Sequence, residues 1–195
     1  MEYQTGDLIL FNGNGWLSWC LEYFGRCQFS HIGMIIVNPP NLNGVYLLDI
    51  SISQPHCVQL KPLDNVIKTY DGSVYYRKMN FERDQDFQQK IIDTYNNIKD
   101  KPYDLNVFEW LSAKILLDTG NLKDSESVLF SDPHNKNTFF CSALVAYIYV
   151  SCSVLPANTP WSIIAPVDFS SGYCKFKLDF KCTFEKEKLL NRKYI

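Results

Sequence analysis

The sequence lacks three features that would each point to a particular class of protein. It has no CxxC pair among its seven cysteines, so the cysteines indicate neither a common zinc motif nor a thioredoxin-type redox motif. It has no apolar run of the roughly 18 residues that a membrane-spanning helix needs, because serines interrupt the most apolar stretch, residues 139–155. Its formal net charge is only −2, so no nucleic-acid partner is expected.

The N-terminus also lacks a basic segment followed by an apolar stretch, so we expect no signal peptide. Without a secretory leader a disulfide framework is not expected, and the cysteines indicate a cytoplasmic or other reducing compartment. Cys20, Cys27 and His31 match no common zinc-ligand spacing, so we expect neither a metal nor another cofactor. Packing or chemistry must therefore explain at least one of the cysteines.

The sequence contains no repeat, low-complexity tract or Gly/Ser linker, which predicts a single domain over residues 1–195. Strand patterns occur at residues 7–11, 31–37, 45–50, 58–60, 73–77 and 173–178. Helical periodicity predicts helices over residues 16–24, 84–98, 107–117 and 139–150, with a polar loop at 120–137 and a solvated tail at 186–193. Strands and helices are grouped apart, which is typical of an α+β fold with a mostly antiparallel sheet packed against a buried helix.

Cys141 lies at the predicted start of the last helix. With Asn137 or Thr138 as the N-cap, Cys141 falls in the first helical turn, where the helix dipole favours a thiolate. The unsatisfied backbone N–H groups of that turn are also suitable donors to an oxyanion. The alternative is that Cys141 only packs, since free cysteine is among the most buried residue types.

His31 and Asp49 lie on two strands joined by a turn-rich segment. If Val37 pairs with Asn43, then His31 lies directly opposite Asp49, and opposed Cβ atoms are about 4.5–5.5 Å apart. An imidazole–carboxylate hydrogen bond at that distance would fix the histidine tautomer and stabilise its cation. The alternative is a pair that only ties the two strands together.

Four motifs occur in a characteristic order along the chain: Gly6-Asp7-Leu8-Ile9-Leu10-Phe11, Ser30-His31-Ile32-Gly33-Met34, Leu47-Leu48-Asp49 and Phe140-Cys141-Ser142-Ala143-Leu144-Val145. This order resembles the circularly permuted branch of the NlpC-type papain-fold cysteine hydrolases, as in the bacterial YiiX-like proteins. Lecithin:retinol acyltransferase and a poxvirus virion protein family look like more distant relatives. In that branch histidine precedes cysteine in the chain, the reverse of the order in papain.

The resemblance implies a permuted papain-like fold in which Cys141 is the nucleophile and His31 the general base. The third polar position, often Glu in this branch, falls on Asp49. Tyr103 and Ser142 are the expected substrate-binding residues. The implied reaction is acyl transfer through a thioester, with a peptide, another amide-linked molecule or a lipid as substrate.

We favour a peptidase or amidase over the two alternatives. One alternative is a lipid acyl hydrolase or acyltransferase of the same fold, with an apolar groove formed by Trp16, Trp19, Tyr23 and Phe24. The other is a non-catalytic structural protein that retains the fold, located in a virion with virion proteins as its partners.

Overall fold

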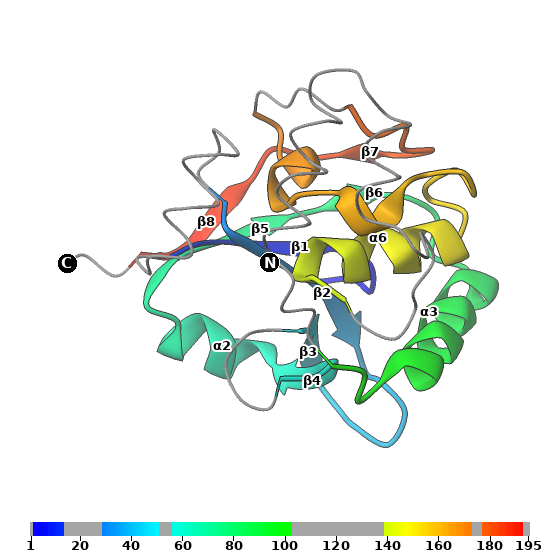
Figure 1. Ribbon diagram of the computed structural model, residues 1–195. Helices are drawn as coiled ribbons and strands as arrows, with labels where there is room; N and C mark the ends of the chain where they lie inside the picture. Colours follow the sequence, from blue (N-terminus) through cyan, green and yellow to red (C-terminus); the bar gives the residue numbers. More distant parts are fainter. Residues whose placement is uncertain (1, 14–28, 51–55, 103–138, 173–176, 193–195) are drawn as a thin grey trace.

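The computed structural model describes residues 2–13, 29–50, 56–102, 139–172 and 177–192. Its centre is a six-stranded sheet with strand order β4-β3-β2-β1-β5-β8 (Figure 1), in which every neighbouring pair is antiparallel. The strands are β1 Leu8–Gly13, β2 His31–Val37, β3 Val45–Asp49, β4 Gln59–Pro62, β5 Gly72–Arg77 and β8 Lys188–Arg192. The predicted α+β class and antiparallel sheet are confirmed.

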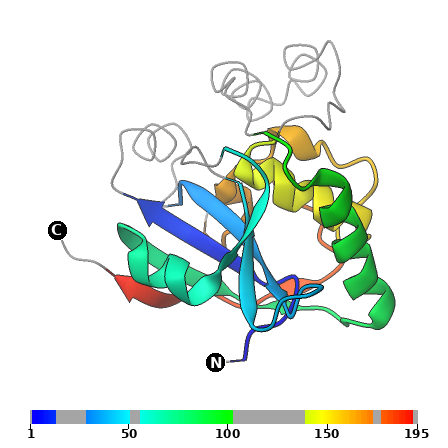
Figure 2. The same ribbon diagram turned by 90° about the horizontal axis from the view of Figure 1, so that it is seen from below.

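The sheet has different helices on its two faces (Figure 2). Successive side chains of a strand point to opposite faces, so Leu8 and Leu10 join a large cluster with helices α3 (Gln85–Ile98) and α6 (Cys141–Ser151). Ile9 and Phe11 join a smaller cluster with helix α2 (Leu63–Thr69). The sheet is therefore covered on both faces, which explains why its central strands are almost entirely buried.

Helix α6 is buried because it is apolar around its whole circumference. Eight of its residues are buried, Cys141 through Ala146 together with Ile148 and Tyr149, and a helix without a polar face belongs inside a protein. It packs between β2 and α3. Helix α3 instead buries one stripe, with Phe87, Ile91 and Ile98 among its buried residues. None of the described helices is long and apolar enough to span a bilayer.

The remaining described elements lie mainly in the C-terminal part of the chain. They are the two-stranded pair β6 (Met79–Asn80) and β7 (Thr183–Phe184), and the 3₁₀ helices η1 (Trp161–Ile163) and η2 (Pro166–Phe169). η1 contacts α6, and through Trp161 it becomes part of the large cluster.

The predicted strand at residues 31–37 matches β2 to the residue, and the predicted helix at 84–98 matches α3 with Asp84 as its N-cap. The C-terminal prediction was wrong. Residues 177–178, the described end of the predicted strand 173–178, lie in no strand, whereas the predicted solvated tail contains β8. Charged residues are common on edge strands, and β8 covers the edge of β5. The predicted helices at 16–24 and 107–117 and the loop at 120–137 lie outside the described residues.

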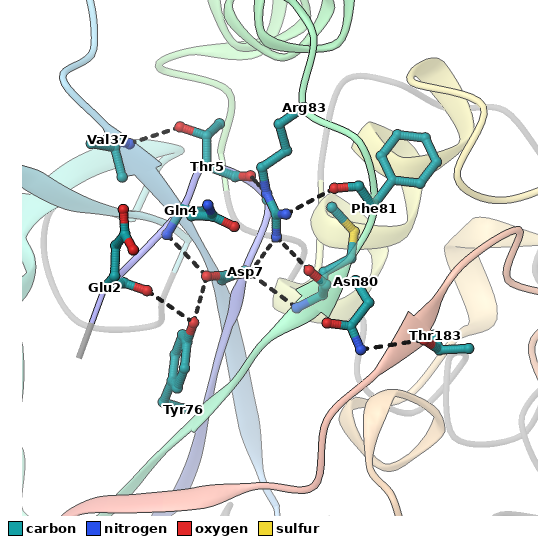
Figure 3. A network of polar contacts seen from close by, with 12 residues as sticks. Glu2, Gln4, Thr5, Asp7, Val37, Tyr76, Asn80, Phe81, Arg83 and Thr183 are labelled. Carbon is teal, nitrogen blue, oxygen red and sulfur yellow. Dashed lines mark hydrogen bonds and ion pairs between the residues drawn. The ribbon is translucent and has the colours of Figure 1, made fainter.

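A buried ion pair fixes the start of β1 (Figure 3). Asp7 is fully buried, and its carboxylate accepts hydrogen bonds from the backbone N–H groups of Gln4 and Met79, the Tyr76 hydroxyl and the Arg83 guanidinium. The Arg83 contact is 2.6 Å long. Both carboxylate oxygens are therefore satisfied, as a charge in a protein interior requires. The network ties β1 to the β5–β6 segment.

Gly33 in β2 is required by the close approach of β3. A Cβ atom at this position would lie 2.7 Å from Leu47 Cδ1, 2.9 Å from Leu47 Cγ and 3.0 Å from the Leu48 carbonyl oxygen. We expect Gly33→Ala to lower the free energy of unfolding by about 1–3 kcal/mol, because overpacking displaces both strands. Urea denaturation measures the loss. Gly44→Ala is a poor control because of its positive φ, so Ser73→Ala on β5 serves instead, and equal midpoints for both variants would contradict the prediction.

Candidate active site

The β2–β3 hairpin forms as predicted, but its register differs from the prediction by two residues. Val37 pairs with Val45 rather than with Asn43, so the prediction of the pairing was wrong. The loop is longer than predicted because Asn38 and Gly44, at its two ends, bind each other. The Asn38 N–H donates to the Gly44 carbonyl at 2.8 Å, and the Gly44 N–H donates to Asn38 Oδ1 at 2.9 Å. Both residues have positive φ, which asparagine and glycine tolerate best.

His31 and Asp49 meet in spite of the different register. A shift by two residues leaves every side chain on its predicted face, whereas a shift by one would have moved it to the other face. The two residues are therefore diagonal neighbours across β2 and β3 instead of directly opposed. Diagonal neighbours are still within reach of long side chains, and His31 Nε2 lies 2.7 Å from Asp49 Oδ1.

Cys141 is the first residue of α6, and the helix start carries no side-chain cap. The N-cap is Phe140, whose side chain cannot accept a hydrogen bond, and the first helical bond runs from the Leu144 N–H to the Phe140 carbonyl at 2.9 Å. The backbone N–H groups of Cys141, Ser142 and Ala143 precede that bond, so no helix carbonyl pairs with them. The helix start therefore combines a thiol with N–H donors that the helix itself leaves open.

This helix start differs in one detail from the prediction. The helix begins two residues later than the predicted residue 139, and the expected caps, Asn137 and Thr138, lie outside the described residues. The later start moves Cys141 to the first helical position, where the effect of the helix dipole is concentrated.

The thiol of Cys141 lies close to the imidazole of His31, since its charge and a hydrogen bond to the ring are among the causes that raise the pKa of His31. Since Nε2 is bound to Asp49, Nδ1 is the ring nitrogen left for the thiol. By strand alternation His31 belongs to the α2 face of the sheet, while Cys141 packs in the cluster on the α6 face. They meet because each is the first residue of its element.

The surroundings of His31 favour its cationic form. Burial by itself lowers the pKa of His31, but the negative charges of Cys141 and Asp49, with their hydrogen bonds to the ring, raise this pKa to about 10. Opposite charges next to a histidine act in this direction. The imidazole is one-fifth exposed, whereas Cys141 is almost closed to solvent, and the ring of Phe11 lies beside the imidazole with centroids 5.2 Å apart.

Asp49 is a buried carboxylate with two charged partners. Its Oδ1 binds His31, and its Oδ2 lies 2.7 Å from Lys61 Nζ. Burial raises the pKa of Asp49, but the charge and hydrogen bond of His31, followed by those of Lys61, lower this pKa to about 2. Asp49 therefore stays ionised at neutral pH.

Of the five predicted site residues, the structure brings Cys141, His31 and Asp49 together. Ser142 is 1% exposed, so its side chain is closed to solvent, and Tyr103 lies outside the described residues. Lys61 was not predicted. The sequence did contain a signal for it. Val58 and Leu60 are apolar and share one face of their predicted strand, so Lys61 points to the opposite face, where it can meet Asp49 of the neighbouring strand.

No group of three or more His, Cys, Asp and Glu side chains suited to a metal ion occurs among the residues that the structure describes. Of the other described cysteines, Cys152 is the C-cap of α6 and is buried, whereas Cys57 and Cys182 are both partly exposed. Burial raises the pKa of Cys152 to about 12 and that of Cys182 to about 11. Neither thiol is therefore activated in the way that a nucleophile requires.

Comparison with known proteins gives a match at the level of structure. No protein-family model matches the sequence, and no curated protein matches it. Among solved structures, the chain is similar to the metalloprotein YiiX from Escherichia coli O157:H7, with a TM-score of 0.57, 16% sequence identity and coverage of 100% of both chains. The predicted resemblance is thus confirmed at the level of fold: the chain has the permuted papain-like fold of YiiX over its whole length.

Proposed function

We propose that this protein is a cysteine hydrolase whose site consists of Cys141, His31 and Asp49, within one domain formed by residues 1–195. The observation that carries the proposal is the position of His31, whose imidazole binds the thiol at a helix start on one side and a buried carboxylate on the other. A nucleophile, a base and a group that orients the base, joined by hydrogen bonds, form the arrangement needed for nucleophilic acyl transfer.

The proposed reaction proceeds in two steps. The Cys141 proton passes to Nδ1 of His31 before the substrate reacts, because the site favours the cationic form of His31. The sulfur then attacks the substrate carbonyl, forming a C–S bond while the electron pair of the carbonyl moves to oxygen. The N–H groups at the start of α6 stabilise that oxyanion. On collapse, the amine leaves with the proton from His31, and a thioester remains on Cys141. Water, deprotonated by His31, then releases the acid and restores the thiol.

Asp49 supports both steps by holding the imidazole in one tautomer and stabilising its cation. Because Oδ1 binds Nε2, the proton stays on Nε2 and Nδ1 remains the nitrogen that exchanges protons with sulfur. Asp49 remains charged throughout, since its pKa is lowered to about 2.

The substrate class that we favour is an amide, in a peptide, an isopeptide or a peptidoglycan-type link. A lipid ester is the alternative within the same mechanism. Incubation with peptide substrates, peptidoglycan fragments and phospholipid vesicles separates the two, with a mass shift of Cys141 as the sign of the acyl-enzyme. Release of fatty acid alone would contradict the amide proposal, and the Cys141→Ala variant controls for contaminating hydrolases.

The similar protein YiiX is described as a metalloprotein. The candidate site of this chain does not suit a cation well, because one oxygen of Asp49 binds His31 and the other binds the ammonium group of Lys61. Carboxylate ligands of a metal need oxygens that are free to coordinate it. Each step of the proposed reaction therefore uses only the side chains and backbone of this chain and water.

The proposal predicts selective alkylation of Cys141. Cys141 is the first residue of α6 and Cys152 is its C-cap, and both are 5% exposed. The two thiols are therefore matched in burial but lie at opposite ends of the helix dipole. With a low dose of iodoacetamide at pH 7 we expect Cys141 to react at least about tenfold faster than Cys152. Peptide mass mapping at successive times measures both rates in one sample.

Cys57, which is partly exposed, provides the control for simple access of the reagent. If Cys141 reacts no faster than Cys57 and Cys152, the thiol is not activated, and the non-catalytic structural role becomes the better explanation of the fold.

A further inference from the structure

We propose that Lys61 is a positioning residue of this site: it binds the second oxygen of Asp49 and thereby holds the carboxylate on the imidazole of His31. This inference rests on the proposed function and extends the site from three side chains to four. It assigns a role to a lysine that the proposed reaction does not use.

The sheet itself places these side chains in one row. Lys61 pairs with Leu47 on β3, and Asp49 pairs with Gln59 on β4, so Lys61 and Asp49 are diagonal neighbours on one face. His31 lies diagonal to Asp49 on the other side of β3. Three adjacent strands thus carry a base, an acid and a cation, with 2.7 Å between Nε2 and Oδ1 and 2.7 Å between Oδ2 and Nζ.

Two partners on its two oxygens restrict rotation of the Asp49 carboxylate. The side chain of Asp49 is 5% exposed and that of Lys61 is 26% exposed, so the ion pair is shielded on the side of Asp49 and open to water on the side of Lys61. A carboxylate with one partner can turn about its χ2 angle, which is a soft torsion. The second partner therefore keeps Oδ1 directed at Nε2.

Lys61 also adds a positive charge to the site. The charged groups around Asp49 are His31 from β2 and Lys61 from β4, and those around His31 are Asp49 from β3 and Cys141 from α6. A cation favours the deprotonated form of each nearby acid. Lys61 therefore extends the range in which Asp49 is ionised towards lower pH.

The test compares wild type with Lys61→Met, Lys61→Arg and the control Lys68→Met. The Met variant keeps the apolar part of the side chain and removes its charge, the Arg variant keeps the charge, and Lys68 is an exposed residue of α2. The rate of Cys141 alkylation is measured from about pH 3 to 9. Loss of the Lys61 charge makes it easier for the acidic groups of the site to take up a proton. In Lys61→Met we therefore expect the fall of the alkylation rate at low pH, the acid limb of the profile, to occur about one pH unit higher than in wild type.

We expect Lys61→Arg to restore the wild-type profile, and Lys68→Met to leave it unchanged. A merely structural role of Lys61 would lower the rate by the same factor at every pH and leave the limb in place, and that result would overturn the inference. An equal shift in Lys68→Met would overturn it as well, because the effect would then be one of net charge.

A second measurement does not depend on the reactivity of the thiol. The titration of the Asp49 carboxyl is followed by carbon-13 NMR, with the signal assigned from Asp49→Asn. We expect its midpoint to be higher in Lys61→Met than in wild type, and an unchanged midpoint would contradict the role of Lys61. If wild-type Cys141 is not selectively alkylated but this midpoint moves, the proposed function fails while the contact between Lys61 and Asp49 stands.

Discussion

Replacement of His31 by alanine is expected to reduce alkylation of Cys141 at pH 6 by about a hundredfold. An ordinary thiol with a pKa of about 8.5 is only about 0.3% ionised at that pH. In wild type, the imidazolium of His31 persists up to its raised pKa of about 10 and attracts a negatively charged sulfur, so the alkylation rate should fall less at low pH than the rate of a free thiol does. In the variant the rate should instead rise with pH, as for a free thiol.

The effect on turnover should be larger than the effect on alkylation. In the proposed reaction His31 acts twice, as base and as acid, so we expect a loss of about 10³-fold or more. The measurement is a pH series of alkylation rates, followed by the release of product from whichever substrate wild type accepts. His56→Ala is the matched control, because His56 is exposed. A pH profile that is the same for His31→Ala and wild type would contradict the ion pair.

Replacement of Asp7 by alanine is expected to give the largest loss of stability, about 3–5 kcal/mol in the free energy of unfolding. The variant leaves the Arg83 guanidinium in a largely buried site without its carboxylate and removes the acceptor of the Met79 N–H. The Tyr76 hydroxyl keeps only its long contact of 3.5 Å with the Glu2 carbonyl. A buried charge that has lost its partner costs far more than the pair contributes when it is intact. Urea denaturation at pH 7 measures the change.

Two further variants test whether the unpaired buried charge causes this loss of stability. Asp86→Ala removes a surface pair with Lys90, whose contact is also 2.6 Å long but largely exposed, and we expect almost no change of the denaturation midpoint. Asp7→Ala combined with Arg83→Met removes both charges and should recover part of the lost stability. If the double variant is less stable than Asp7→Ala alone, the unpaired charge is not the cause.

The pairing of His31 with Asp49 could be predicted because side chains on a strand alternate between two faces. The predicted register was wrong by two residues, but such an error leaves every side chain on its predicted face. Only whether His31 and Asp49 are directly opposed or diagonal depended on the length of the loop. The loop length itself was not predictable, because it depends on positive φ angles at Asn38 and Gly44 that their residue types permit but do not impose.

Other parts of the fold could not be predicted because contacts with distant parts of the chain, and not the local sequence, decide their structure. Lys188–Arg192 looks like a charged tail, and it becomes a strand only because β5 offers it a hydrogen-bonding edge. Phe140 was not predictable as an N-cap, since phenylalanine has no preference for that position. Lys61 was missed because a lysine in a strand usually indicates a solvated face, and its carboxylate lies on a neighbouring strand.

The position of α6 in the chain has a consequence for synthesis on the ribosome. The histidine and the carboxylate lie on the early strands β2 and β3, while the sulfur arrives with a helix that is made much later and must enter between β2 and α3. A nascent chain that ends before this helix contains neither the proposed nucleophile nor the apolar helix that fills the larger cluster. The proposed reactivity of Cys141 and the completion of the interior would therefore be acquired in the same event, when α6 takes its place.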